Sequence, residues 1–301
     1  MFQKMIDINK VLAVINPISG DRNKDEMENI LRKEAKEEGV QIAFFYTTGE
    51  NDITKLSGEI KKEHPNCVLA IGGDGTTNLV AKTLIDKTVY MSIIPAGSAN
   101  GMAKEFNISA DINGAIKRLL HGNEQMLDLI NINEDLFSLH LSDMGLNARV
   151  IKRFDKESSR GLSGYAKQYF KELNNNEPTK YTIRVKEKTI KTKAIMVVLA
   201  NGTRYGTGAI ISPLGNPSDG VFELLIIKPY PWWAIFSFIA AFFIGRIHKL
   251  KYVKMIKCSE AKIECITPQQ TQIDGEPVGE NSKIVAKILP ACLKFIIPEV
   301  R

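Results

Sequence analysis

The sequence predicts an α/β fold in two parts: an N-terminal open, mostly parallel sheet with helices on both faces, followed by a β-sandwich domain. Up to about residue 125, short apolar runs alternate with amphipathic segments, which is typical of β-α units in a parallel sheet. Beyond Leu127, alternation at period two replaces that pattern and favours a β-rich region. Glycine-bearing loops follow several predicted strands near the N-terminus. In an open α/β sheet these strand ends lie on one edge, where ligands bind.

The N-terminal region can be divided into alternating strands and helices. Unbroken apolar runs favour buried strands at 12–15, 42–46, 67–71 and 92–94. Apolar residues at helical spacing predict the helices, and the first helix is expected to end at Gly39. These helix-forming sets are Met27, Ile30, Leu31 and Ala35; Ile53, Leu56 and Ile60; Leu79, Val80 and Leu84; and Ile116, Leu119 and Leu120.

The C-terminal region is predicted to be mainly β. Strands are expected at 127–132, 181–186, 195–200, 221–227, 262–266 and 284–288, with helical insertions at 145–154 and 163–173. The change of pattern predicts an α/β nucleotide-binding domain over 1–125 and a β-rich domain over 126–301. The pattern leaves open whether the last strand returns to the first domain. Small-molecule sites often lie in the cleft between two such domains.

Composition limits the compartment and the partners. The net charge is +6 and the pI is about 9.0, which favours contact with an acidic partner or has no specific meaning. The sequence contains no arginine-rich tract, so we expect no nucleic-acid partner. The four cysteines form no CxxC pair, and Met1 to Lys10 contains no apolar signal core. A cytoplasmic protein without a disulfide framework is therefore expected.

The loop Gly72–Thr76 is the most informative motif. It directly follows the apolar run 67–71, and the residues after it can begin a helix. Glycines let the backbone approach a ligand closely, and a helix N-terminus presents N–H groups to anions. The Asp74 carboxylate would repel a phosphate unless a cation lies between them. The loop therefore indicates a nucleotide with a divalent metal, or else a tight strand–helix turn without a ligand.

Three further motifs accompany this loop: Asn16–Gly20, Pro95–Gly101 and Ile273–Pro277. Together, and in this order, the four motifs resemble the diacylglycerol kinase catalytic family of lipid kinases, to which sphingosine and ceramide kinases are more distantly related. The resemblance implies an ATP- and Mg²⁺-dependent kinase that phosphorylates a lipid hydroxyl, with diacylglycerol as the leading acceptor. NAD kinase, with a similar fold and glycine loop, is an alternative, as is a non-catalytic lipid-binding regulator.

The resemblance also implies roles for individual residues. Positions of the ATP site are Asn16, Thr47, Gly72, Gly73, Asp74, Gly75, Thr76, Thr77, Asn78 and Ser98, and Ser19 and Gly20 of the first loop are expected beside them. Taken singly, several of these residues are also typical of caps and turns. The general base is expected at Asp274 or Glu276, while Asp74 is a further candidate for base or metal anchor. An ordinary Asp-Gly hairpin turn is the competing interpretation of Asp274.

Two other positions bear on the metal and on the acceptor. The resemblance implies a structural magnesium at Asp219, with Asn216 and Val221 beside it, and a plain Asp-Gly turn is the alternative. Asn100 is followed by Gly101 where many bacterial diacylglycerol kinases have an aspartate. This variant is closer to the sphingosine and ceramide kinase form, so the acceptor lipid stays open.

The segment 230–245 contains no charged residue and has two tryptophans at its start. A basic cluster follows it, at Arg246, His248, Lys249, Lys251 and Lys254. The segment is shorter than the roughly 20 residues that span a bilayer. It predicts either an interfacial helix on anionic lipid or a helix buried against the sandwich. We therefore expect peripheral association with the inner face of the membrane. The segment 160–165 resembles the family's segment near the lipid entrance, which implies that its basic residues meet a lipid headgroup, and the alternative is that they face solvent. A homodimer is an open alternative to a monomer.

Overall fold

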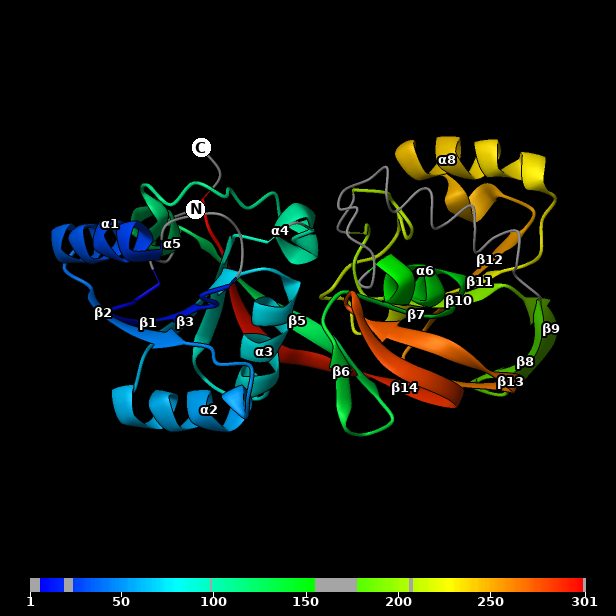
Figure 1. The fold of residues 1–301 in the computed structure, drawn as a ribbon, viewed down its shortest axis with the longest axis horizontal. Helices are drawn as coiled ribbons and strands as arrows, with labels where there is room; N and C mark the ends of the chain where they lie inside the picture. The colour runs from blue at the N-terminus through cyan, green and yellow to red at the C-terminus, as the bar shows by residue number, and fades with distance from the viewer. Residues whose placement is uncertain (1–5, 19–23, 98, 155–177, 206–207, 300–301) are drawn as a thin grey trace. The chain divides into compact units, whose positions relative to one another are not determined.

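A computed structural model describes residues 6–18, 24–97, 99–154, 178–205 and 208–299 (Figure 1). The chain divides into two compact units. The first, called here the α/β unit, comprises Met1–Leu127 and Ala291–Arg301. The second, the β-rich unit, comprises Asp128–Pro290. The predicted helical insertion at 163–173 and the segment 160–165 lie outside the described residues.

Parallel strands form the sheet of the α/β unit, in the order β2-β1-β3-β4. These strands are β1 (Lys10–Ile15), β2 (Gln41–Tyr46), β3 (Cys67–Gly72) and β4 (Tyr90–Pro95). The C-terminal end of β14 (Glu276–Ile297) adds to the same sheet, because Phe295 pairs in parallel with Met91 of β4. Every residue of β3 is buried, which explains its continuous apolar run.

Helices cover both faces of this sheet, as the β-α alternation predicts (Figure 1). On one face lie α1 (Lys24–Glu37) and α5 (Ala115–Leu120), which bury Leu31 and Ile116 in one core with Ala13 of β1. On the other face lie α2 (Asp52–Glu63) and α3 (Asp74–Leu84), which contact each other. The sequence did not predict α4 (Gly101–Glu105), which is too short to show a helical period.

The β-rich unit is a mainly antiparallel arrangement, which confirms the predicted sandwich-like class. Its strands are β5 (Asn123–Ile132, begun in the α/β unit), β6 (Leu136–Ser138), β7 (Leu141–Gly145), β8 (Thr179–Val185), β9 (Lys188–Ala194), β10 (Met196–Ala200), β11 (Phe222–Ile227), β12 (Val253–Cys258), β13 (Glu260–Ile273) and β14. The predicted insertion at 145–154 is present as α6 (Leu146–Phe154). Strands β13 and β14 are longer than predicted, because polar residues interrupt their apolar pattern.

Two hydrophobic cores lie on opposite faces of β10 and β11. Val197 and Leu224 contribute to the core between the layers of strands. Val198 and Leu225, their neighbours in the chain, contribute to a second core. The second core is covered by α8 (Ile235–Phe243), which follows the short 3-10 helix η1 (Trp232–Ala234). A second 3-10 helix, η2 (Ile247–Lys249), lies after α8. Burial on both faces explains the unbroken apolar sequences of β10 and β11.

Candidate active-site loops

The carboxyl ends of four parallel strands meet on one edge of the α/β sheet. Ile15 at the end of β1 is in register with Tyr46 of β2 and with Ile71 of β3. Gly72 is in register with Pro95 of β4. Four predicted site segments therefore leave the sheet at this edge, beginning with Asn16, Thr47, Gly73 and Ala96. Residues that are far apart in the sequence are thus gathered by strand register alone.

Backbone hydrogen bonds hold the starts of these loops together. The Asn16 N–H donates to the Ile71 carbonyl at 3.3 Å, and the Thr47 N–H donates to the Ile15 carbonyl at 3.0 Å. Across the next strand pair, the Ala96 N–H donates to the Gly72 carbonyl at 2.8 Å. The loops therefore start from a rigid base, which is the arrangement that positions a ligand with precision.

Glycines at two positions leave no room for a side chain at the starts of these loops. A Cβ on Gly97 would lie 2.5 Å from the Gly73 Cα, so the loops after β3 and β4 pack backbone against backbone there. A Cβ on Gly72 would meet the Thr76 Oγ1 of its own loop at 2.3 Å. The requirement for glycine at both positions is therefore steric.

Helix α3 begins at Asp74, directly after the loop, and Gly73 is its N-cap in extended conformation. The N–H groups of the first helical turn have no partner inside a helix, so this end favours an anion. The Thr77 hydroxyl already has a partner within the protein, because its Oγ1 donates to the Gly73 carbonyl at 3.1 Å. The Thr76 Oγ1 is buried with no hydrogen-bond partner among the described residues. Asn78 is buried too.

Asp74 links the two glycine loops. Its Oδ1 accepts a hydrogen bond of 2.7 Å from the Gly101 N–H, the first residue of α4. Asn100 stands in the left-handed region at φ 54°, and its side chain makes two hydrogen bonds with the Gly97 backbone, of 3.0 and 2.6 Å. The residue after Asn100, at which this chain departs from the bacterial pattern, is thus the one whose amide binds Asp74.

Of the remaining residues predicted for the nucleotide site, only part can be placed. Asn16 lies at the sheet edge, where its Oδ1 accepts from the Ile18 N–H at 3.0 Å in a local turn. Ser19, Gly20 and Ser98 lie outside the described residues.

In the β-rich unit, the two late carboxylates have contrasting surroundings. The Asp274 carboxylate accepts four hydrogen bonds from one segment of chain: Ser138 Oγ at 3.0 Å, Leu139 N–H at 2.7 Å, and the His140 and Leu141 N–H groups at 2.8 Å. Glu276 is exposed, and its side chain makes no hydrogen bond or ion pair within the described parts of the chain. The Asp274 carboxylate is therefore committed to the segment 138–141, while the Glu276 carboxylate faces solvent.

Gln272 and Asp143 form a buried polar network next to the turn at Asp274–Glu276. The Gln272 Nε2 donates to the Asp143 Oδ2 at 2.6 Å, and the Gln272 Oε1 accepts from the Gly275 N–H at 2.7 Å. Asn147 also donates to this Asp143 oxygen. Gln272 is 1% exposed and Asp143 is 2% exposed. The amide of Gln272 thus joins an interior carboxyl to the backbone between Asp274 and Glu276.

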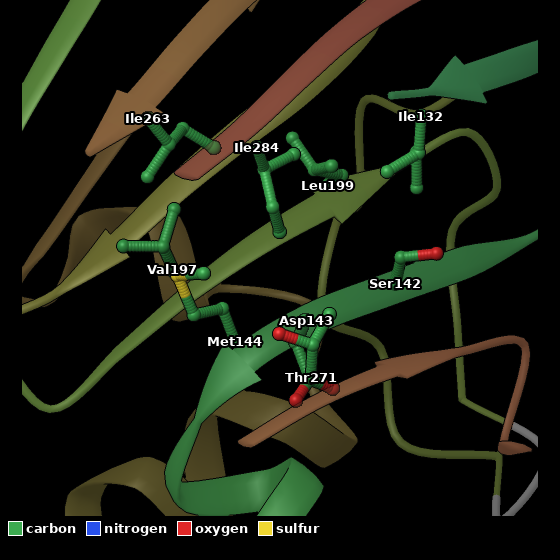
Figure 2. Close-up of a pocket in the computed structure, with 9 residues that line it drawn as sticks. All are labelled: Ile132, Ser142, Asp143, Met144, Val197, Leu199, Ile263, Thr271 and Ile284. Atoms are coloured by element: carbon green, nitrogen blue, oxygen red, sulfur yellow. The ribbon is translucent and has the colours of Figure 1, made fainter. Parts of the chain in front are cut away.

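Asp143 lines a small pocket together with apolar residues such as Val197 and Ile263, and it lies beside Thr271 (Figure 2). Burial raises the pKa of Asp143 from 3.8 to about 6, against the hydrogen bonds from Asn147 and Gln272, which lower it. Neither Asp143 nor Gln272 was predicted from the sequence. The only signal was a polar residue in each of two strands, which does not distinguish an interior position from an exposed one.

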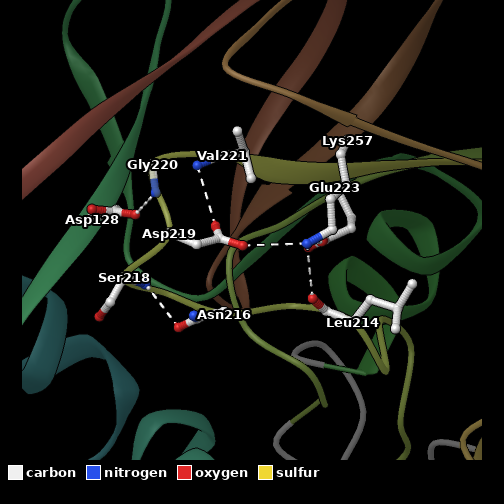
Figure 3. A network of polar contacts seen from close by, with 9 residues as sticks. All are labelled: Asp128, Leu214, Asn216, Ser218, Asp219, Gly220, Val221, Glu223 and Lys257. Carbon is white, nitrogen blue, oxygen red and sulfur yellow. Dashed lines mark hydrogen bonds and ion pairs between the residues drawn. The ribbon is translucent and has the colours of Figure 1, made fainter.

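The residues predicted to bind a metal form a turn, and the aspartate of this turn is paired with the ammonium of Lys257 on β12 (Figure 3). The Asp219 Oδ1 accepts from the Val221 N–H at 3.3 Å, and the Asn216 Oδ1 accepts from the Ser218 N–H at 3.2 Å. The other carboxylate oxygen of Asp219 binds the Lys257 ammonium at 3.2 Å. Among the described residues, no group of three or more His, Cys, Asp or Glu side chains has a metal-binding arrangement.

The comparisons with known proteins agree with this architecture. The model of the diacylglycerol kinase catalytic domain matches residues 10–132, and that of the YegS C-terminal NAD kinase beta sandwich-like domain matches 142–297. The probable lipid kinase YegS of Escherichia fergusonii is 25% identical over 303 residues, with 98% of each chain covered. The probable lipid kinase YegS-like of Klebsiella pneumoniae is 24% identical over 280 residues, covering 91% of this chain and 90% of that one.

Among solved structures, the crystal structure of a diacylglycerol kinase from Bacillus anthracis str. Sterne matches with a TM-score of 0.78 at 19% identity. It covers 97% of this chain and 98% of that one, which shows the shared fold. The resemblance inferred from the glycine loops is confirmed by the two family models, one for each part of the chain. The chain belongs to the YegS-like and diacylglycerol kinase family of lipid kinases.

Proposed function

We propose that this protein transfers the γ-phosphoryl group of ATP to the hydroxyl of a membrane lipid, most simply diacylglycerol, giving phosphatidic acid. The observation that supports this best is the single sheet edge at which the loops after β1, β2, β3 and β4 converge beside the N-terminus of α3. Phosphoryl transfer depends on positioning and charge stabilisation, and such an edge supplies both. In this proposal the two units are the nucleotide and acceptor domains.

The nucleotide half of the proposal rests on the backbone. The first-turn N–H groups of α3 would hold phosphate oxygens, and the buried Thr76 hydroxyl is a further donor near them. Mg²⁺, when bound with ATP, would neutralise phosphate charge, and it usually takes one or two protein carboxylates together with phosphates and waters. Asp74 fits that requirement as the carboxylate of the loop itself.

The chemical half of the proposal separates the roles of the late carboxylates. Glu276 would accept the proton of the attacking hydroxyl, because its side chain is exposed and has no hydrogen-bond or ion-pair partner among the described residues. Asp274 would be a positioning residue, because its four hydrogen bonds commit both carboxylate oxygens to residues 138–141. Gln272 would hold the intervening Gly275 backbone in place.

A membrane-facing role is supported by the two faces of α8. Ile235, Phe238 and Ala241 are buried in the second core of the β-rich unit. On the other face the exposed apolar side chains are Trp232 (68%), Trp233 (61%), Phe236 (66%), Ile239 (43%), Phe243 (73%) and Ile244 (62%). None of the helices in the described part of the chain has the length and apolar character needed to span a bilayer.

We propose that this exposed face inserts shallowly into the membrane interface. The basic residues that follow it, among them Arg246, Lys249 and Lys251, would attract anionic headgroups. In this proposal both sequence interpretations of 230–245 contribute, because one face packs on the core and the exposed face would meet the lipid. The test is flotation with vesicles, in which Trp232→Ala with Trp233→Ala should weaken binding. Ile266→Ala, which removes an apolar side chain 74% exposed on β13, is the matched control.

The decisive experiment for the reaction is turnover of labelled ATP against a panel of lipids, with NAD included. Phosphatidic acid formed from diacylglycerol, and lost in Asp74→Asn, is the expected result. Phosphorylation of a sphingoid base or ceramide instead would keep the lipid kinase function and change the acceptor. Phosphorylation of NAD would favour the NAD kinase alternative. Absence of turnover with every acceptor, despite nucleotide binding, would favour a regulator that binds lipid without catalysis.

A further inference from the structure

The turn at Asp219 contains an unusual concentration of charge around one lysine. The Lys257 Nζ lies 3.2 Å from the Leu214 carbonyl oxygen, 3.2 Å from the Asp219 Oδ2 and 3.1 Å from the Glu223 Oε1 (Figure 3). An ammonium group has three N–H donors, and three oxygen atoms surround this one. Oxygen atoms from a carbonyl and from carboxylates are also the ligands that hard divalent cations prefer.

Strand register explains why the lysine is there. Glu223 on β11 and Lys257 on β12 are directly opposite each other in the antiparallel pair. Glu223 is 1% exposed, so its carboxylate has little access to water and needs a nearby positive charge. The Lys257 ammonium, 3.1 Å from the Glu223 Oε1, supplies that charge.

The turn itself is also held without any metal. Asp128, which is 2% exposed, accepts from the Gly220 N–H at 2.7 Å through its Oδ2, and its own N–H donates to the Pro217 carbonyl at 2.7 Å. The second oxygen of Asp219 accepts from the Val221 N–H. The backbone of the turn thus has protein partners on both sides, and the ammonium supplies the positive charge.

A divalent cation does not fit beside this lysine. A Mg²⁺ ion bound at about 2.1 Å to the Asp219 oxygen that Lys257 contacts would lie within about 5 Å of the ammonium. Two cations at that distance repel each other strongly in a partly buried site. The set of residues implied by the family resemblance, namely Asn216, Asp219 and Val221, therefore disagrees with the surroundings that the fold gives them.

We infer that the Lys257 ammonium takes the place of a structural divalent cation in this chain, so that the turn at 214–221 is stabilised independently of metal. The protein's remaining requirement for Mg²⁺ would then be the one that accompanies the nucleotide. This inference concerns only the β-rich unit and does not depend on which acceptor the protein uses.

The test uses thermal unfolding and metal content, with no nucleotide present. The native protein, dialysed without a chelator, should contain no stoichiometric Mg²⁺, Ca²⁺ or Mn²⁺ by mass spectrometry. Its Tm should be the same in EDTA and in excess Mg²⁺ at matched ionic strength. Retained metal, or a Tm that rises with Mg²⁺, would overturn the inference whether or not the protein proves to be a kinase.

Variants sharpen the same test. Lys257→Ala should lower the Tm by about 5 °C, because it leaves Glu223 buried without its cation. It should also create sensitivity to divalent ions, with Mg²⁺ or Mn²⁺ restoring part of the loss. Lys254→Ala, an exposed lysine on the same strand, is the matched control and should show neither effect. If Lys257→Ala destabilises no more than Lys254→Ala does, the ammonium does not hold the turn and the inference is wrong. If Lys257→Ala fails to fold, the native-protein measurements still decide.

Discussion

The two Asp-Gly turns of the β-rich unit have the same dipeptide and opposite surroundings. At Asp274-Gly275, the carboxylate accepts hydrogen bonds from the backbone and hydroxyl donors of 138–141. At Asp219-Gly220, the carboxylate is paired with the ammonium of Lys257. Both glycines have positive φ, 94° for Gly275 and 73° for Gly220, but only the first turn also has its aspartate in the left-handed region, with Asp274 at φ 49°. Neighbours from elsewhere in the chain give the two carboxylates different partners, backbone and hydroxyl donors at Asp274 and an ammonium at Asp219.

A third Asp-Gly, at Asp74-Gly75, extends the comparison to the α/β unit. It does not form a hairpin turn, because it is the first turn of α3. Its aspartate binds a backbone amide of another loop, Gly101. Substitutions at these carboxylates separate a contribution to catalysis from a contribution to stability.

The largest effect is expected for Glu276→Gln. Loss of a general base costs about 100-fold or more in kcat. Nucleotide affinity measured by calorimetry and the Tm should both stay native, because Glu276 is exposed and has no recorded partner among the described residues. Full kcat in this variant would move the base elsewhere, with Asp74 as the next candidate.

Asp74→Ala should reduce kcat by about 100-fold or more, because a preorganised charge near the phosphates is lost. It should also lower the Tm by a few degrees, about the loss of one hydrogen bond to a charged group, since the Gly101 N–H loses its acceptor. Asp74→Asn keeps an acceptor oxygen and separates the two effects. A near-native kcat in folded Asp74→Asn would show that the charge is not needed.

For Asp274→Asn we expect a mainly structural loss, of about 3 kcal/mol in the free energy of unfolding. The asparagine has one acceptor oxygen for four donors, and its amide group faces backbone N–H groups. Urea unfolding gives the stability change, and kinetics should show kcat reduced less than in Glu276→Gln. A stable variant with kcat as low as that of Glu276→Gln would assign the proton transfer to Asp274.

Asp143 predicts a pH dependence of stability. Its folded pKa of about 6 lies above the ordinary 3.8, so the folded protein binds more protons than the unfolded chain between these values. Its contribution to stability is fully present below about pH 4 and is lost as pH rises through about 6. The size is about 3 kcal/mol, from about two pKa units at about 1.4 kcal/mol each.

In Asp143→Asn that loss is absent, so the free energy of unfolding of the variant relative to native should rise by about 3 kcal/mol between pH 4 and 7. Urea titrations at several pH values measure it, and Asp135→Asn, an exposed aspartate of the same unit, is the control. A difference that does not change with pH would mean that the Asp143 carboxyl is ionised in the folded protein over the whole range.

The smallest effect is expected for Asp219→Asn, below about 1 kcal/mol, because both partners of its ion pair are partly exposed. Lys257 retains Glu223 and the Leu214 carbonyl as partners in this variant. Thermal unfolding of Asp219→Asn and of Asp274→Asn, measured side by side, compares the two Asp-Gly turns directly. An equal loss in the two variants would remove the distinction between them.

Sequence alone determined the fold class, the order of β-α units, the loop after β3 and the family. These depend on short-range properties: apolar runs mark buried strands, helical spacing marks helices, and glycine is required where two backbones meet at Gly73 and Gly97. The same patterns could not predict α4, which is too short to show a helical period, or the full lengths of β13 and β14, whose exposed residues are polar.

Only the tertiary structure decided the partners of the carboxylates. The backbone amides of 139–141 reach Asp274 across more than 130 positions, Gln272 reaches Asp143 across 129, and Lys257 reaches Asp219 across 38. Such pairings depend on strand register and on which face of a strand is buried, and no local pattern encodes either. A carboxylate in a turn has the same sequence signature whether it binds backbone amides, an ammonium or a metal, because its charge is satisfied by residues that only the fold brings near.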